Sequence, residues 1–179
     1  MVHRQAVLGE YSGAVGAPIM LIGEAPGRLG ADRTGRPFVG DRSGDNLRLL
    51  LERAGIRRDD VFITNAVLCC PTDGERNQRP SIAEVKNCGS FLADTIRLVG
   101  PQVVATLGAV ALDAVQRGFA SDLPRWRLAD VVRRRIVLDA FTLIPLYHPS
   151  PRVINSRRDF KTQLADMRAV ARAARQRAS

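Results

Sequence analysis

The sequence has little lysine, although it is strongly basic. Lys and Arg together number 27 against 18 Asp and Glu, for a formal net charge of +9, yet only Lys86 and Lys161 are lysines. The charge is therefore carried almost wholly by guanidinium groups, whose planar fork suits phosphate oxygens. An arginine excess favours a polyanionic partner such as nucleic acid, whereas a GC-rich genome raises arginine content without any such partner. Charge alone leaves both explanations open.

Cysteine is scarce as well, and long apolar runs are absent. Cys69, Cys70 and Cys88 are the only cysteines, and they make no plausible disulfide framework, which fits a reducing cytoplasm. No apolar segment approaches the ~20 residues that span a bilayer, and the N-terminus lacks a signal-peptide pattern. A length of 179 residues fits one domain. We therefore expect a single cytoplasmic, monomeric domain over residues 1–179 with no membrane segment.

Short apolar runs alternate with segments of helical periodicity along the chain. The runs suited to buried strands are 19–22, 61–67, 103–107, 136–138 and 141–146. The helical segments are 47–54 before Gly55, a segment from the capping box of Ser81 and Glu84 to Gly100, 109–117 before Gly118, and 160–171. This alternation predicts a three-layer α/β/α sandwich around a central, mostly parallel sheet of about four strands.

Three loops follow predicted strands and are rich in glycine or polar residues, namely 21–44, 64–80 and 147–156. Ligands of parallel sheets bind beyond the carboxyl ends of the strands. Because these three loops all leave such ends, we expect them to converge on one site.

The first of these loops, LIGEAPGRLGADRTGRPFVGDRSG, holds six glycines and a single aromatic residue, Phe38. It is not a P-loop, because no Gly-Lys-Ser/Thr follows. It also differs from a dinucleotide-binding loop, because no helix opens directly after the strand. The glycines fit either a surface loop with positive φ angles or a backbone that approaches a ligand closely. Phe38 is either a core residue or a platform for a flat ring.

The other two loops each contribute one conspicuous polar residue. Asn65 ends the run VFITN, where its amide either forms a turn or binds the edge of a base. His148 directly follows the last run, where it either holds the loop or donates a hydrogen bond into a site. Basic and polar residues after it suit phosphate contacts or form a solvated face. They are Ser150, Arg152, Asn155, Ser156, Arg157 and Arg158.

Taken together, the three loops resemble the uracil-DNA glycosylase superfamily. GEAPG at 23–27, TGRPFVG at 34–40 and ITNAV at 63–67 with the following Cys69 resemble family four. The spacing of GRLGADRTG, the GDRSGD at 40–45 and the HPSPRVIN at 148–155 are more similar to family five. The resemblance covers nearly the whole chain and blends the two families.

The resemblance implies an enzyme that flips uracil out of DNA and hydrolyses its N-glycosidic bond, the first step of base excision repair. Phe38 would stack on the uracil, and Asn65 would bond its Watson–Crick edge. His148 would stabilise the negative charge on the leaving base. Backbone N–H groups of the first loop would hold the carbonyl oxygens. The substrate-binding residues implied in this loop are Gly23, Ala25, Pro26 and Gly27.

The same resemblance points to residues for the attacking water and for the DNA. Glu24 is the favoured residue to orient or activate water. Asp45, in the pattern similar to family five, is a competing candidate or else a helix N-cap. Asn77 would assist at the same centre. The predicted DNA contacts are Ser43, Ser150, Arg152, Asn155 and Arg157, with Arg152 and Val153 as candidates to fill the gap left by the flipped base.

The cysteines depart from the family pattern. Families four and five typically carry a four-iron, four-sulfur cluster on four cysteines, of which Cys69 and Cys88 match two. The first twenty residues contain none, Cys70 lies next to Cys69, and His3 is a poor substitute at a chain terminus. We therefore predict no iron–sulfur cluster, no other metal and no cofactor, with Cys69 and Cys88 packed as small apolar residues.

Two other functions stay open at this point. One is a non-catalytic or covalent uracil-DNA binding protein on the same scaffold, although CCPTDGERNQRP at 69–80 lacks the histidine through which some relatives capture DNA. The other is a hydrolase of small nucleotides. None of the three loops contains lysine, which argues against a Schiff-base lyase step. The segment 118–135 matches no motif, and its Trp126 either packs or stacks on a base.

Overall fold

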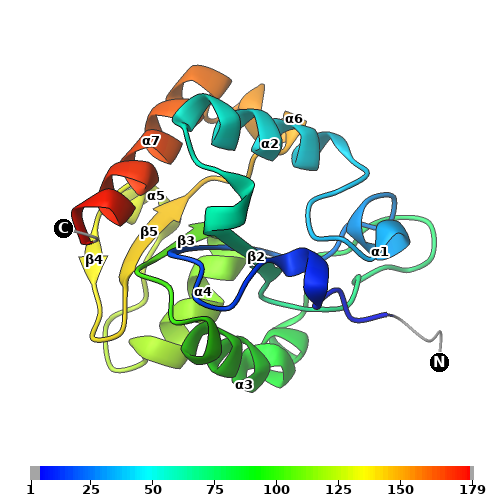
Figure 1. Cartoon of the computed structure of the whole chain (residues 1–179). Helices are drawn as coiled ribbons and strands as arrows, with labels where there is room; N and C mark the ends of the chain where they lie inside the picture. Colours follow the sequence, from blue (N-terminus) through cyan, green and yellow to red (C-terminus); the bar gives the residue numbers. More distant parts are fainter. Residues whose placement is uncertain (1–4, 178–179) are drawn as a thin grey trace.

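The computed structural model of the chain describes residues 5–177, and in it a central sheet runs through the molecule (Figure 1). Its strands are β1 (Ile19–Gly23), β2 (Val61–Asn65), β3 (Val103–Leu107), β4 (Ile136–Val137) and β5 (Thr142–Leu146). Their order is β2-β1-β3-β5-β4, and only β4 pairs antiparallel. The four parallel strands are buried along their whole length, as expected when helices cover both faces of a parallel sheet.

Four long helices form the outer layers, two on each face of the sheet (Figure 1). The helices α2 (Arg42–Ala54) and α7 (Phe160–Arg177) pack on one face, where Leu47 and Met167 join the core. The helices α3 (Ile82–Val99) and α4 (Ala109–Phe119) cover the other, with Ile96 and Leu112 buried. The predicted three-layer α/β/α sandwich is confirmed.

Short helices complete the chain between these elements. They are the 3-10 helices η1 (Glu10–Ser12) and η2 (Arg58–Asp60) and the single-turn helices α1 (Ala31–Thr34), α5 (Leu128–Val131) and α6 (Pro151–Ile154). Within the described residues, no helix combines the length and the apolarity that a bilayer crossing requires.

The sequence-based element boundaries are mostly confirmed. Ser81 accepts a hydrogen bond from the backbone N–H of Glu84, and the Glu84 carboxylate accepts one from that of Ser81, so the predicted capping box starts α3. Helix α2 ends at the left-handed Gly55, as predicted.

Two predictions need correction. The sheet has five strands in the described residues instead of about four, because the run 136–138 adds a short antiparallel edge. Helix α4 does not end at Gly118 but continues to Phe119. Gly118 does not adopt a positive φ, and the backbone N–H of Ala120 still reaches the carbonyl of Gln116 at 2.8 Å.

Candidate active site

A cleft of about 600 Å³ lies where the loops after β1, β2 and β5 meet, beside the first turn of α4. The expected convergence of the three loops is therefore confirmed. Eleven of the predicted site residues line it, and these are Glu24, Ala25, Pro26, Gly27, Phe38, Ser43, Asn65, Asn77, His148, Ser150 and Arg152. Val153, proposed above as a gap-filling residue, lines it as well.

Phe38 and Asn65 meet over the backbone of Gly23. The register of β1 and β2 sets Gly23 beside Asn65, at the carboxyl ends of both strands. A Cβ atom at Gly23 would lie 2.8 Å from a ring carbon of Phe38 and closer still to the Asn65 amide oxygen. Glycine was expected to let groups approach the backbone closely, and at Gly23 the Phe38 ring and the Asn65 amide do so. Gly23 makes room for the ring and the amide, and does not itself line the cleft.

The backbone of Phe38 is held in a conformation that is unusual for a residue with a side chain, with φ at 55°. Its carbonyl packs so closely on Gly44, in the first turn of α2, that a Cβ there would overlap with it. Asp41 caps this helix, since its carboxylate accepts a hydrogen bond from the Gly44 N–H at 2.9 Å. The helix start therefore positions the Phe38 ring.

The His148 ring contacts that of Phe38 in the cleft, with ring centroids 5.6 Å apart and ring planes at 31°. Its loop is tied to α2, because the Asn46 amide donates to the carbonyl of Pro149 at 2.9 Å. Burial lowers the pKa of His148, and the negative charge of Asp41 partly opposes this. The imidazole is consequently neutral at pH 7, and its one N–H can donate a hydrogen bond into the cleft.

Two carboxylates face the cleft, and only one of them, Glu24, is among the two that the sequence pattern suggested. Glu24 lines it and is half-buried, so burial raises the pKa of this carboxyl, an effect that Arg79 partly opposes. Asp41 also lines it. Asp45 instead lies exposed in the first turn of α2, outside the cleft lining. Its suggested alternative role was wrong as well, because the N-cap of α2 is Asp41.

Asn77 joins the second loop to the first. The segment 71–78 folds back on itself through a bridge between Thr72 and Asn77, and the Gln78 N–H donates to the Pro71 carbonyl at 2.7 Å. The Asn77 side-chain oxygen accepts a hydrogen bond from the Arg28 backbone N–H at 2.9 Å. This contact holds the glycine-rich loop in place. It also occupies the Asn77 side-chain oxygen.

Not all of the predicted DNA contacts reach the cleft. Ser43, Ser150 and Arg152 lie along it, and Ser150 also caps α6. Asn155, at the C-terminal end of α6, and Arg157 are exposed and lie outside the lining. Arg158, which the sequence offered for phosphate contact, makes a two-pronged ion pair with the buried Asp166 instead.

Sequence reasoning missed several residues that the structure brings to the site, foremost Asp41 and Arg79. Asp41 had a usable signal, because an aspartate immediately before a helical segment is typical of an N-cap. Arg79 had none, since only the folding of 71–78 directs it toward Glu24.

The cysteines do not form a ligand set for an iron–sulfur cluster. Cys70 is buried, and Cys69 and Cys88 are half-buried. Among residues 5–177 no three His, Cys, Asp or Glu side chains gather as a metal site would require. Since such a cluster takes four thiolates, the described residues do not fit it. His3 lies outside the described residues.

Polar contacts tie the N-terminal segment to the rest of the chain. The Arg58 guanidinium donates to the carbonyls of Tyr11 and Val61 at 2.7 and 2.6 Å. The Arg36 guanidinium lies 3.9 Å from the centre of the Tyr11 ring, a cation–π contact that reaches the loop of Phe38. The N-terminal segment is thus anchored beside the site.

The fold and cleft define a three-layer α/β protein whose cleft is lined by an aromatic ring, an amide and an imidazole. The family model described as the uracil DNA glycosylase superfamily matches residues 10–172, and the chain belongs to this superfamily.

Curated relatives carry the same family name. The chain is 39% identical over 144 residues to a type-4 uracil-DNA glycosylase of Thermotoga maritima, covering 80% of this chain and 69% of the relative. It is 35% identical over 168 residues to a type-5 uracil-DNA glycosylase of Pyrobaculum aerophilum, covering 87% and 71%. Another type-5 enzyme, of Mycobacterium tuberculosis, is 32% identical over 165 residues, covering 83% and 60%. Relatives of both types are found, as the blended motifs predicted.

Proposed function

We propose that this chain is a monofunctional uracil-DNA glycosylase, which hydrolyses the bond between uracil and deoxyribose and so starts base excision repair. Membership of the superfamily supports a glycosylase that acts on uracil. The observation that carries the finer proposal is the meeting of the Phe38 ring and the Asn65 amide over Gly23, with His148 5.6 Å from the same ring.

These groups suit a uracil that has been flipped out of the DNA stack. The Phe38 ring offers a flat apolar surface for the base, and its strained backbone is held by the close packing on Gly44. The Asn65 amide carries one acceptor and two donors, which pair with the N3–H and O4 of uracil. Cytosine presents the opposite pattern at these atoms, so the same amide rejects it.

The chemical step needs a donor at the leaving base. Breaking the glycosidic bond leaves negative charge on uracil and positive charge on the sugar. The neutral His148 donates its N–H to the O2 of uracil, where this charge develops. A preorganised donor in a partly buried site stabilises such a charge far better than water does.

A water must then attack the sugar, and the cleft offers Glu24 and Asp41 to orient it. The Asp41 carboxylate already accepts a hydrogen bond from Gly44 and caps the helix that supports Phe38. Glu24, in contrast, lies in the loop that follows β1 and lines the cleft. Glu24 is thus the residue for the water, and Asp41 is a positioning residue.

Single-turnover cleavage of uracil-containing DNA tests this division. Glu24→Gln should slow the chemical step by about 100-fold or more. Asp41→Asn should lower both the cleavage rate and the free energy of unfolding. Asp45→Asn is the matched control and should leave the rate unchanged, because the carboxylate is exposed outside the cleft. Full activity of Glu24→Gln, or a large loss in Asp45→Asn, would reverse the assignment.

The proposed reaction stops at hydrolysis because no lysine lines the cleft. Lys86 belongs to α3 and Lys161 to α7, so neither supplies an amine for a Schiff base. On a denaturing gel, uracil-DNA should give a free abasic product and no protein band shifted by bound DNA. A shifted band would instead support a covalent binding protein. Activity on free nucleotides but not on DNA would support a nucleotide hydrolase.

We propose further that the chain works as a monomer without a cofactor. For the cofactor, the proposal is supported by the side chains present, because among residues 5–177 no three His, Cys, Asp or Glu side chains gather as a metal site would require. Purified protein should be colourless, should contain less than one iron per chain, and should elute at the mass of one chain in light-scattering chromatography. Stoichiometric iron with absorption in the visible range would refute the cofactor statement.

A further inference from the structure

A second hollow lies away from the cleft, between α3, α4 and the segment that follows α4. It measures about 670 Å³, and its apolar lining comes from Val85, Ala93, Ala114 and Leu123. We call it the α3–α4 groove. None of its lining residues lines the cleft, so the proposed glycosylase reaction does not use it.

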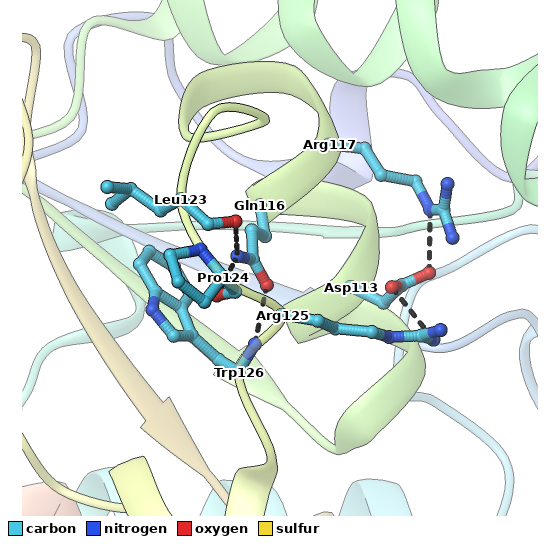
Figure 2. Close-up of polar contacts among 7 residues, drawn as sticks. All are labelled: Asp113, Gln116, Arg117, Leu123, Pro124, Arg125 and Trp126. Carbon is cyan, nitrogen blue, oxygen red and sulfur yellow. Dashed lines mark hydrogen bonds and ion pairs between the residues drawn. The ribbon is translucent and has the colours of Figure 1, made fainter.

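One wall of the α3–α4 groove is built by a buried glutamine (Figure 2). The Gln116 amide is 6% exposed and donates to the carbonyls of Leu123 and Pro124, at 3.3 and 2.9 Å. Its oxygen accepts the backbone N–H of Trp126 at 2.9 Å. These three bonds fix residues 123–126 against α4. The Trp126 side chain packs against the core on this face, so packing rather than exposure explains this residue.

A single carboxylate orients two guanidinium groups at the edge of the groove (Figure 2). Asp113 accepts a hydrogen bond from Arg117 at 2.8 Å and forms an ion pair with Arg125 at 2.9 Å. The Asp113 side chain is only 20% exposed, whereas those of Arg117 and Arg125 are 40% and 70% exposed. Each arginine has five N–H groups, so both retain donors for a further carboxylate.

The charges along the α3–α4 groove are predominantly positive. Four cations line it, namely Lys86, Arg97, Arg117 and Arg125, against two carboxylates, Asp94 and Asp113. A ligand that complements it is therefore negatively charged and carries an apolar group for the lining.

We infer that the α3–α4 groove docks an acidic peptide segment of a partner protein. Its carboxylates bind the Arg117 and Arg125 guanidinium groups in the bidentate manner that arginine favours. An apolar side chain of the peptide lies on Ala93, Ala114 and Leu123. Nucleic acid fits less well, because a sugar–phosphate backbone has no apolar side chain to place on this lining.

Fluorescence anisotropy with the full chain tests the inference. The probe is a labelled peptide of aspartates flanking two leucines, and the comparison peptide has serines in place of the leucines. Arg125→Glu should weaken binding of the leucine peptide by tenfold or more, since one reversed charge pair of about 1.4 kcal/mol corresponds to that factor. Serine in place of leucine should weaken it as well, because the apolar lining then contributes nothing.

Two further variants make the result specific. Gly118→Leu places an apolar side chain in the groove without changing its charge, so peptide binding should be lost. The fold should tolerate the variant, because a Cβ at Gly118 lies at an ordinary contact distance of 3.9 Å from Ala93. Arg48→Glu is the matched control, since Arg48 is 68% exposed and also pairs with a carboxylate, but it lies on α2. It should leave peptide affinity within twofold. All three variants should cleave uracil-DNA at the normal rate.

Three results would overturn the inference. One is no peptide binding up to about 1 mM, the limit of weak but specific contacts. Another is unchanged affinity in Gly118→Leu, which would place the peptide elsewhere. The third concerns uracil-free single-stranded DNA. If Arg125→Glu weakens binding of this DNA as much as it weakens binding of the peptide, the α3–α4 groove is a nucleic-acid surface.

Discussion

The cleft and the α3–α4 groove both set carboxylates against arginines, yet in different surroundings. In the cleft, burial raises the pKa of Glu24 and lowers that of His148. In the groove, Arg117 and Arg125 remain 40% and 70% exposed around Asp113. Glu24 and His148 are therefore partly buried in the cleft, whereas the arginines at the α3–α4 groove stay accessible to solvent. Desolvated groups suit chemistry, because their interactions are strong, whereas exposed charges suit recognition of a partner.

The largest expected difference between the two regions concerns His148. His148→Ala should lower kcat for uracil release by about 100- to 1,000-fold, since it removes the donor to the leaving base. Arg125→Glu, in the α3–α4 groove, should leave kcat within twofold. Quench-flow kinetics on one duplex substrate measures both. A loss of less than fivefold for His148→Ala would mean that the donor lies elsewhere in the cleft.

The next largest effect tests how Phe38 is held. Gly44→Ala forces a Cβ against the Phe38 carbonyl, so the free energy of unfolding should fall by about 1–3 kcal/mol and uracil excision should fall with it. The matched control is Gly89→Ala, in α3 beside the groove, where a Cβ meets nothing within 4 Å. The free energy of unfolding of this variant should rise by up to about 1 kcal/mol. Urea titration measures both, and equal stabilities would contradict the packing argument.

A smaller effect concerns the pH dependence of excision. In the proposed mechanism Glu24 is ionised when it orients the water. Burial raises the pKa of Glu24, so this mechanism predicts that activity falls as the pH drops through a value above the usual range of a glutamate. The positive charge of Arg79 opposes this rise. Arg79→Gln should therefore move the acid limb of the kcat profile to higher pH.

The exposed Arg76, on the same hairpin as Arg79, provides the control. Arg76→Gln should leave the acid limb where it is, because Arg76 does not line the cleft. An acid limb that stays fixed in Arg79→Gln would show that Glu24 does not control the profile.

The smallest effect belongs to the ion pairs at the groove. Asp113→Asn should lower the free energy of unfolding by no more than about 1 kcal/mol, since pairs with exposed partners contribute little. Excision should stay unchanged, while affinity for the acidic peptide changes because Arg117 and Arg125 lose their orientation. Thermal unfolding together with anisotropy separates these outcomes. A loss of excision would link the groove to the cleft.

Much of the fold was predictable, because it depends on local patterns. The apolar runs of the parallel strands and the capping box of Ser81 and Glu84 were sufficient to place the main elements. Phe38, Asn65 and His148 were expected to come together, and they line one cleft, since loops after parallel strands meet at one edge of the sheet. The run 136–138 was also predicted as a buried strand, but β4 lies at the antiparallel edge of the sheet with Val137 exposed.

The choice between carboxylates was not predictable in the same way. Asp41 and Asp45 lie four residues apart in GDRSGD, and both fit a helix start. Only the packed helix decides that Asp41 caps it and lines the cleft while Asp45 faces solvent. Likewise, the sequence presented Arg157 and Arg158 as equals, but the buried Asp166 engages Arg158.

The amino-acid sequence by itself determined the layered architecture, the three loops and the family to which the chain belongs. These follow from periodicity, caps and motifs, each of which acts over a few residues. Tertiary structure alone decided which carboxylates line the cleft, how Gly23 and Gly44 hold Phe38, and that a basic groove lies between α3 and α4. Those features depend on atoms distant in sequence that come within a few ångströms, and on how much water the packing excludes around them.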